Sequence, residues 1–139
     1  MCVLSDYAYI MQLDIKEYLN HKDSNREISS LLKDFETKNN MVLKELEEAK
    51  EESAICENKL AEWDTVVQTI ENQIVAISKD GKTREYYNLT EMLNVKKLYR
   101  DGLLMDLKKT ENDVNLLEEM KKRLKFNITV CKTTLLQNQ

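Results

Sequence analysis

The stretch AISKDGKTREY, residues 76–86, decides how this chain folds. It contains Gly81, one of only two glycines in 139 residues that include no proline. Glycine and proline carry the largest penalties inside a helix, so little else in the chain interrupts one. Gly81 suits the left-handed position after a helix, and Thr83 suits the cap of the next helix. The flanking residues lack the alternation that strands show, so we expect a turn between helices and not a β-hairpin.

The segment before this turn carries the most regular apolar pattern in the chain. Its seam positions recur at alternating steps of four and three over seven heptads. Such a repeat is typical of a coiled coil, because the helix must supercoil around a partner to keep its seam covered. Ser24 and Glu27 form a capping box, so we expect this helix over 24–79. The predicted seam consists of Ile28, Leu32, Phe35, Asn39, Val42, Leu46, Ala49, Ser53, Cys56, Leu60, Trp63, Val67, Ile70, Ile74 and Ile77.

The segment after the turn is long enough to be that partner, and we expect a helix over 83–137. Its later part repeats the alternation of four and three. Its earlier part, through Met92, Val95 and Tyr99, contains consecutive steps of four, which predicts a stutter where the coil unwinds locally. The predicted seam of the later part consists of Leu103, Leu107, Thr110, Val114, Leu117, Lys121, Leu124, Ile128, Cys131 and Leu135.

Two helices of similar length joined by a short turn predict an all-α fold built on a long antiparallel helical hairpin. Burying both seams within one chain avoids the concentration cost of finding another chain. The numbers of facing residues should then add up to about 162, to within several residues. This places Trp63 near Tyr99 and Ile28 near Leu135. A dimer of extended chains without the turn is the alternative topology.

The N-terminal segment predicts a third, short helix over 3–19. Its apolar stripe consists of Leu4, Ala8, Met11, Ile15 and Tyr18. Because this helix is much shorter than the other two, we expect it to pack at the open end of the hairpin, so that 1–139 form one elongated helical unit. His21 lies in the connector that follows, where we expect a solvated loop histidine and not a metal ligand.

Composition excludes several classes of protein. A net charge of -4 argues against a nucleic-acid partner, since DNA binding depends on an excess of Lys and Arg. The chain has three cysteines, Cys2, Cys56 and Cys131. An odd number of cysteines far apart in sequence indicates neither a disulfide framework nor a zinc site. We expect a protein of the reducing cytoplasm.

Motifs that carry chemistry are missing from the sequence. We find no glycine-rich phosphate loop, no nucleophile elbow and no paired-histidine metal signature. The opening MCVLSDYAYI has no basic region and no apolar run is long enough for a membrane helix, so we expect neither a signal peptide nor membrane insertion. We therefore expect no enzyme activity, no cofactor and no bound metal.

Six aromatic and apolar residues are candidates for docking other proteins. The set consists of Leu4, Tyr7, Tyr9, Trp63, Tyr86 and Tyr87. Trp63 is bulky for a two-helix seam, so it either lies across Tyr99 or projects to anchor a partner. Tyr86 and Tyr87 beside the turn either close the hairpin or form a docking tip.

Charge is unevenly distributed along the chain. A basic strip within 121–132 contains no acidic residue, whereas residues 45–52 contain five glutamates and one lysine. The simpler interpretation is that these are solvated faces with weak pairs between helices. The functional interpretation is a strip that binds an acidic protein tail or an anionic membrane. The strip consists of Lys121, Lys122, Arg123, Lys125 and Lys132.

The stretch KKLYRDGLLMDLKKTENDVNLLEEMKKRL, residues 96–124, resembles the coiled-coil tail of motile-cilium kinesins of the ninth family. The likeness covers about a fifth of the chain and includes no motor residues, so it implies no motor activity. It implies a structural part of a ciliary or microtubule assembly. The matching residues are Lys97, Tyr99, Leu107, Lys108, Val114, Leu117, Arg123 and Leu124.

These patterns favour a non-enzymatic adaptor that acts as a rigid spacer and docks other proteins in a cytoskeletal or ciliary assembly. We expect its partners to be coiled-coil or filament components, and the pattern leaves a homo-oligomer open. The alternative is a membrane-trafficking tether, or a module that binds anionic membrane surfaces through the basic strip.

Overall fold

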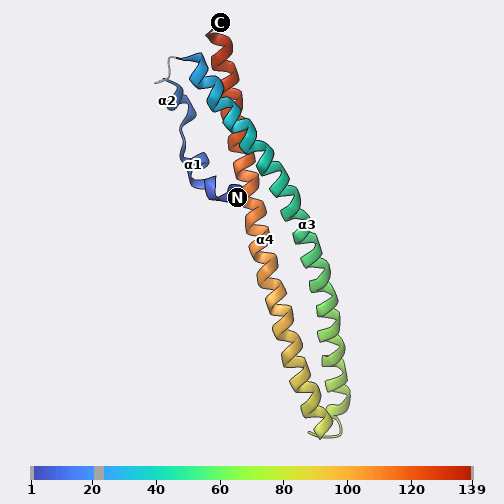
Figure 1. Ribbon diagram of the computed structural model, residues 1–139. Coiled ribbons are helices and arrows are strands. Elements are labelled where there is room, and N and C mark those ends of the chain that lie inside the picture. The colour runs from blue at the N-terminus through green and yellow to red at the C-terminus, as the bar shows by residue number, and fades with distance from the viewer. Residues whose placement is uncertain (1, 21–23, 139) are drawn as a thin grey trace. The chain divides into compact units, whose positions relative to one another are not determined.

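The computed structural model describes residues 2–20 and 24–138, and in these ranges the regular structure is helical throughout. A short 3-10 helix, η1 (Val3–Asp6), leads into α1 (Tyr7–Gln12) and α2 (Ile15–Asn20). The two long helices are α3 (Asn25–Ser78) and α4 (Arg84–Gln137), which pack against each other (Figure 1). The predicted all-α hairpin is confirmed. His21 lies outside the described residues.

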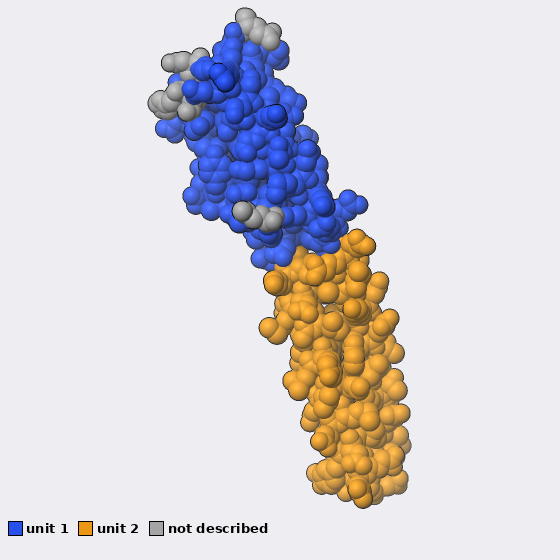
Figure 2. All heavy atoms as spheres, in the orientation of Figure 1, with its two compact units in different colours: residues 1–50, 112–139 blue, residues 51–111 orange. Residues whose placement is uncertain are grey.

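The chain divides into two compact units (Figure 2). Unit 1 comprises residues 1–50 and 112–139, and unit 2 comprises residues 51–111. Each unit therefore contains a stretch of α3 and a stretch of α4, and the N-terminal helices belong to unit 1. That residues 1–139 act as a single unit stays a prediction.

The turn at Gly81 has the geometry that the sequence indicates. Gly81 has φ 90°, and its amide donates a hydrogen bond to the carbonyl of Ser78 at 3.2 Å. This closes the end of α3 in the left-handed conformation that glycine adopts without a steric penalty. The hydroxyl of Thr83 accepts a hydrogen bond from the amide of Tyr86 at 3.3 Å and so caps α4.

The N-terminal segment differs from the single helix that we predicted over 3–19. It is broken at Leu13, which has the extended conformation with φ -69° and ψ 120°. The carboxylate of Asp14 accepts a hydrogen bond from the amide of Glu17 at 3.2 Å. Asp14 therefore caps a new helix, which competes with continuation of the old one.

The core of unit 1 joins the N-terminal helices to α3 and α4. Val3, Ile10 and Ile15 are fully or almost fully buried, together with Phe35 of α3 and Leu124 of α4. The predicted third layer of helix is therefore present. At the ends of the long helices, the side-chain amide of Asn138 donates a hydrogen bond to the side-chain oxygen of Asn25 at 2.9 Å. This pairing agrees with the predicted register, and Ile28 and Leu135 both belong to this core.

The core of unit 2 is much smaller. Its buried cluster consists of Val67, Ile70 and Leu93, with Ile74 packed against it. Two helices alone bury only one stripe each, so few side chains lose contact with water.

The predicted stutter in α4 is wrong. Met92, Val95 and Tyr99 are exposed, and the seam passes instead from Leu93 through Arg100 to Leu107 in even steps of seven. Arg100 is only partly exposed at its seam position, and its guanidinium lies 3.9 Å from a carboxylate oxygen of Asp64 on α3. A long apolar stem lets an arginine occupy such a position while its charged end stays at the surface. Apolarity alone therefore indicated the wrong side of α4 in this stretch.

Candidate docking surfaces

The N-terminal candidates Leu4 and Tyr7 pack partly against the core of unit 1. The hydroxyl of Tyr7 donates a hydrogen bond of 2.5 Å to a carboxylate oxygen of Glu119 on α4. The pKa of Tyr7 is raised mainly by this hydrogen bond, because the bond stabilises the protonated phenol. Leu4 and Tyr7 thus hold the N-terminal segment in place.

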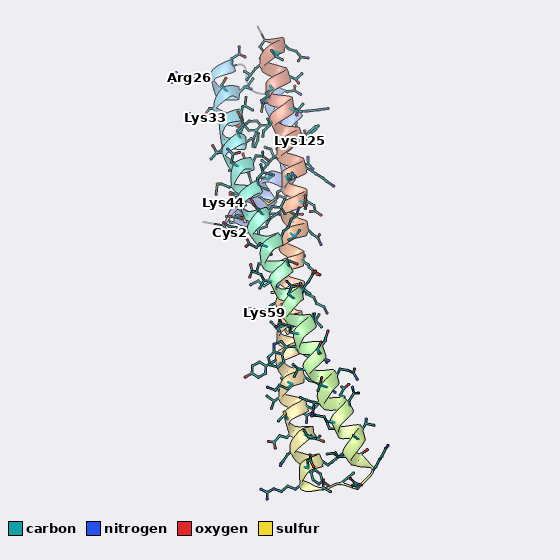
Figure 3. The ribbon with its side chains drawn as sticks, turned by 90° about the vertical axis from the view of Figure 1, so that its right-hand side faces the viewer. Cys2, Arg26, Lys33, Lys44, Lys59 and Lys125 are labelled. Atoms are coloured by element: carbon teal, nitrogen blue, oxygen red, sulfur yellow. The ribbon has the colours of Figure 1, made fainter. Side chains whose placement is uncertain are left out.

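Further contacts tie the same segment to α3. The amide of Val3 donates a hydrogen bond to Glu45 at 2.8 Å, and Lys38 lies 4.9 Å from the ring centroid of Tyr9. Cys2 is exposed beside Glu45 (Figure 3). Tyr9 is about half exposed and is the N-terminal docking candidate that remains most accessible.

Trp63 lies against Tyr99, as one of the two sequence interpretations predicted. The two rings are stacked with centroids 5.5 Å apart and an interplanar angle of 22°. The ammonium of Lys96 lies 5.2 Å from the centroid of Trp63, within the range of a cation–π interaction. Because Tyr99 is 61% exposed, the pair brings an aromatic surface to the outside of unit 2.

The tyrosines beside the turn pack mainly on each other. Tyr86 and Tyr87 meet edge to face with centroids 5.6 Å apart. Tyr86 is partly buried, whereas Tyr87 is exposed. Tyr87 is therefore the one that a partner could reach at this end of unit 2.

The basic strip does not form one face. Lys125, labelled in Figure 3, and Lys132 line a polar pocket of about 440 Å³ between α3 and α4. Lys122 and Arg123 line a different, mostly apolar pocket of about 390 Å³ that also includes the half-exposed Phe126. A flat anionic surface would therefore contact one part of the strip at a time.

An ion pair joins α3 and α4 in unit 1, but it includes neither a residue of the basic strip nor a glutamate of 45–52. Lys50 lies 3.0 Å from a carboxylate oxygen of Glu118. The hydrogen bond from Lys50 is the main cause that lowers the pKa of Glu118. Both side chains are solvent-exposed, so this pair contributes little to stability.

The structure adds a second buried face of α4 that the sequence analysis missed. Met120 and Asn127 are fully buried, whereas the predicted seam residue Lys121 is exposed. A signal existed in the sequence, because Met120, Leu124, Asn127 and Cys131 are spaced by four, three and four. A helix that packs against two neighbours needs a second apolar stripe. For α4 the second neighbour is the N-terminal segment.

Within the described ranges, no group of three or more His, Cys, Asp or Glu side chains could hold a metal ion. The described helices include none that is long and apolar enough to cross a membrane. The chain matches no protein-family model, no curated protein and no solved structure. The resemblance to kinesin tails therefore rests on residues 96–124 alone.

Proposed function

We propose that this protein is a non-enzymatic adaptor that spaces and docks other proteins in a larger assembly. The observation that supports this is the division of apolar residues between an inner seam and outer faces. The helices cover each other's seams within one chain, yet large side chains such as Leu98 and Met105 stay exposed. Exposed apolar patches on a folded chain are typical of protein-binding sites.

The mechanism is presentation of fixed helical faces. In unit 2, α3 and α4 meet in the Trp63–Tyr99 stack and in the buried cluster of Val67, Ile70 and Leu93. A face that is already ordered loses little conformational entropy when a partner binds. The hairpin is thus suited to docking without refolding.

We place this adaptor in a cytoplasmic, cytoskeletal or ciliary assembly, with coiled-coil or filament components as partners. The support is the resemblance of residues 96–124 to the tail of motile-cilium kinesins. Composition points the same way, since 33% charged residues with 42% hydrophobic residues suit helices that pack along seams.

Crosslinking mass spectrometry of the full chain in a native extract tests the adaptor proposal. We expect crosslinks from lysines of both units to the same few proteins, together with co-sedimentation with purified microtubules. Absence of reproducible protein neighbours contradicts the adaptor proposal. Neighbours without microtubule co-sedimentation contradict only the microtubule assignment.

A second candidate function is binding to an anionic membrane surface. The half-exposed Phe126 beside Lys122 and Arg123 favours it, because interfacial segments combine an aromatic side chain with cations. Flotation with anionic liposomes that persists at moderate salt and is lost in Phe126→Ala supports this candidate. Flotation that moderate salt abolishes, or that Phe126→Ala leaves intact, contradicts it.

A further inference from the structure

The outer face of α4 in unit 2 carries a regular apolar stripe that the described structure leaves exposed. We call Val95, Leu98, Gly102 and Met105 the outer stripe. Leu98 is 71% exposed and Met105 is 72% exposed, although both lie in the middle of a long helix. Steps of three and four place the four residues on one side of α4. The stripe has the form of a helix-packing seam without a partner.

Gly102 is unexplained by the packing of a single chain. Glycine is among the least favourable residues in a helix interior. A Cβ atom built on Gly102 would meet no other atom within 4 Å. The hairpin therefore has room for a side chain there and does not require glycine. A missing side chain is useful where another chain approaches the helix closely.

The charges that flank the outer stripe are complementary to those of a second, antiparallel copy of this chain. Glu91 lies four residues before Val95, and Lys109 lies four residues after Met105. The steps between Glu91, the four residues of the outer stripe and Lys109 are therefore four, three, four, three and four. This order of steps is the same in both directions along the helix. An antiparallel copy of α4 centred at the level of Arg100 places Glu91 of each copy opposite Lys109 of the other.

The same arrangement matches the sizes of the apolar residues. Leu98 of each copy falls opposite Gly102 of the other, so a large side chain meets the position that has none. Val95 falls opposite Met105. Both Glu91 and Lys109 are exposed and form no ion pair within the described residues, so each is available to the second copy. The pairing is isologous, as expected for a twofold dimer.

We infer that two copies of this chain associate through the outer stripes of their α4 helices in antiparallel orientation. Unit 2 gains most from this contact, because few of its described side chains are buried and its own buried cluster consists of Val67, Ile70 and Leu93. A stripe of four positions is smaller than a standard protein interface, which indicates a weak dimer. The inference is independent of the adaptor proposal, since an adaptor can act as a monomer or as a dimer.

Sedimentation equilibrium of the full, reduced chain from about 1 µM to about 500 µM tests this inference, because a weak dimer follows mass action. We expect a monomer–dimer equilibrium. Leu98→Asp should raise the dissociation constant at least about 30-fold. The reason is that the contact is symmetric, so that each of the two copies would bury one carboxylate in it. The matched control is Leu136→Asp, at a leucine of the same helix that is 68% exposed and outside the stripe. It should leave the dissociation constant unchanged.

Charge exchange tests the orientation. Glu91→Lys and Lys109→Glu should each weaken the dimer about tenfold, because each places like charges opposite one another. The double variant should restore it. Glu62→Lys, an exposed acid on α3, is the matched control and should have no effect.

A chain that stays monomeric at every concentration overturns the inference, including the case in which another protein occupies the stripe. Association that Leu98→Asp leaves intact also overturns it. If the double charge variant fails to restore dimerisation, the antiparallel pairing is wrong.

Discussion

At the scale of single residues, Asn127 stands out in the core of unit 1. It is fully buried, and neither its side-chain nitrogen nor its oxygen has a hydrogen-bond partner among the described residues. Its neighbours in sequence on the same face, Leu124 and Cys131, are apolar and equally buried. A buried amide without partners costs free energy, because it has lost its hydrogen bonds to water.

Replacing this amide by an isosteric apolar side chain should stabilise the protein. We expect Asn127→Leu to raise the free energy of unfolding by about 1 to 3 kcal/mol, the usual cost of an unsatisfied buried group. Thermal unfolding followed by circular dichroism measures the change as a rise of a few degrees in Tm. The control is Asn115→Leu at an exposed position of α4, which should change Tm little. A fall in Tm for Asn127→Leu would show that the amide is satisfied after all.

The hydroxyl of Tyr7 makes the stability of the N-terminal contact depend on pH. Its pKa is raised above the ordinary value of 10.0, chiefly by the hydrogen bond to Glu119. The stabilisation is therefore fully present below pH 10 and is lost as the pH rises through the raised value.

The Tm of the Tyr7→Phe variant should accordingly fall less than the Tm of the wild type when the pH is raised above 10. The reason is that the variant has no phenol to ionise beside Glu119. Measuring Tm from neutral to alkaline pH for both proteins checks this, with Tyr9→Phe as the control. Parallel curves for wild type and Tyr7→Phe would argue against the contact.

At the scale of the elements, the two glycines have opposite roles. Gly81 has a positive φ and ends α3, whereas Gly102 lies inside α4 with space around it. Only the first position requires glycine for the fold of one chain.

Alanine at the two positions should therefore shift stability in opposite directions. We expect Gly81→Ala to lower the free energy of unfolding by about 1 to 2 kcal/mol, the cost of a left-handed residue with a side chain. Gly102→Ala should raise it by about 1 kcal/mol through helix propensity. Denaturation at low protein concentration, where a dimer does not contribute, measures both. A loss of stability in Gly102→Ala under these conditions would mean that the glycine serves the monomer.

At the scale of the whole molecule, the two units differ in how much core supports their helices. Unit 1 has twelve buried apolar residues, drawn from all its helices, whereas the described residues of unit 2 include four, which are Val67, Ile70, Leu93 and Leu107. Local opening costs less where fewer apolar contacts are lost.

Hydrogen exchange should therefore be faster in unit 2. We expect amides of α3 and α4 within residues 60–105 to exchange before those near Phe35 and Leu124, at protein concentrations below dimer formation. Mass spectrometry of peptic peptides measures the difference. Equal protection in both units would show that the small core of unit 2 does not limit its stability.

Several features could be predicted from local sequence. The turn depends on Gly81 and the adjacent caps, which act over a few residues. The seam of α3 was predicted correctly from Ile28 to Ile77, since those positions are buried or half-buried. The turn and the helix geometry placed Trp63 near Tyr99, and the structure decided between the two interpretations of Trp63, since its ring stacks on that of Tyr99.

Other features required the packed structure. Whether Val95 or Arg100 faces α3 depends on where the stem of an arginine can lie against the partner, and periodicity of apolar residues does not contain that information. Because Arg100 and not Val95 faces α3, the outer stripe lies on the exposed side of α4. The break at Leu13 and the burial of Asn127 depend on how the N-terminal helices fit against α3 and α4.

The sequence by itself thus determined that the chain is helical, where it turns back and which face of α3 is covered. Each of these follows from interactions over a few residues or from one regular repeat. The tertiary structure decided which face of α4 is covered in each unit and which apolar residues remain outside. The physical reason is that a helix with several partly apolar faces is oriented by the side chains of its partners.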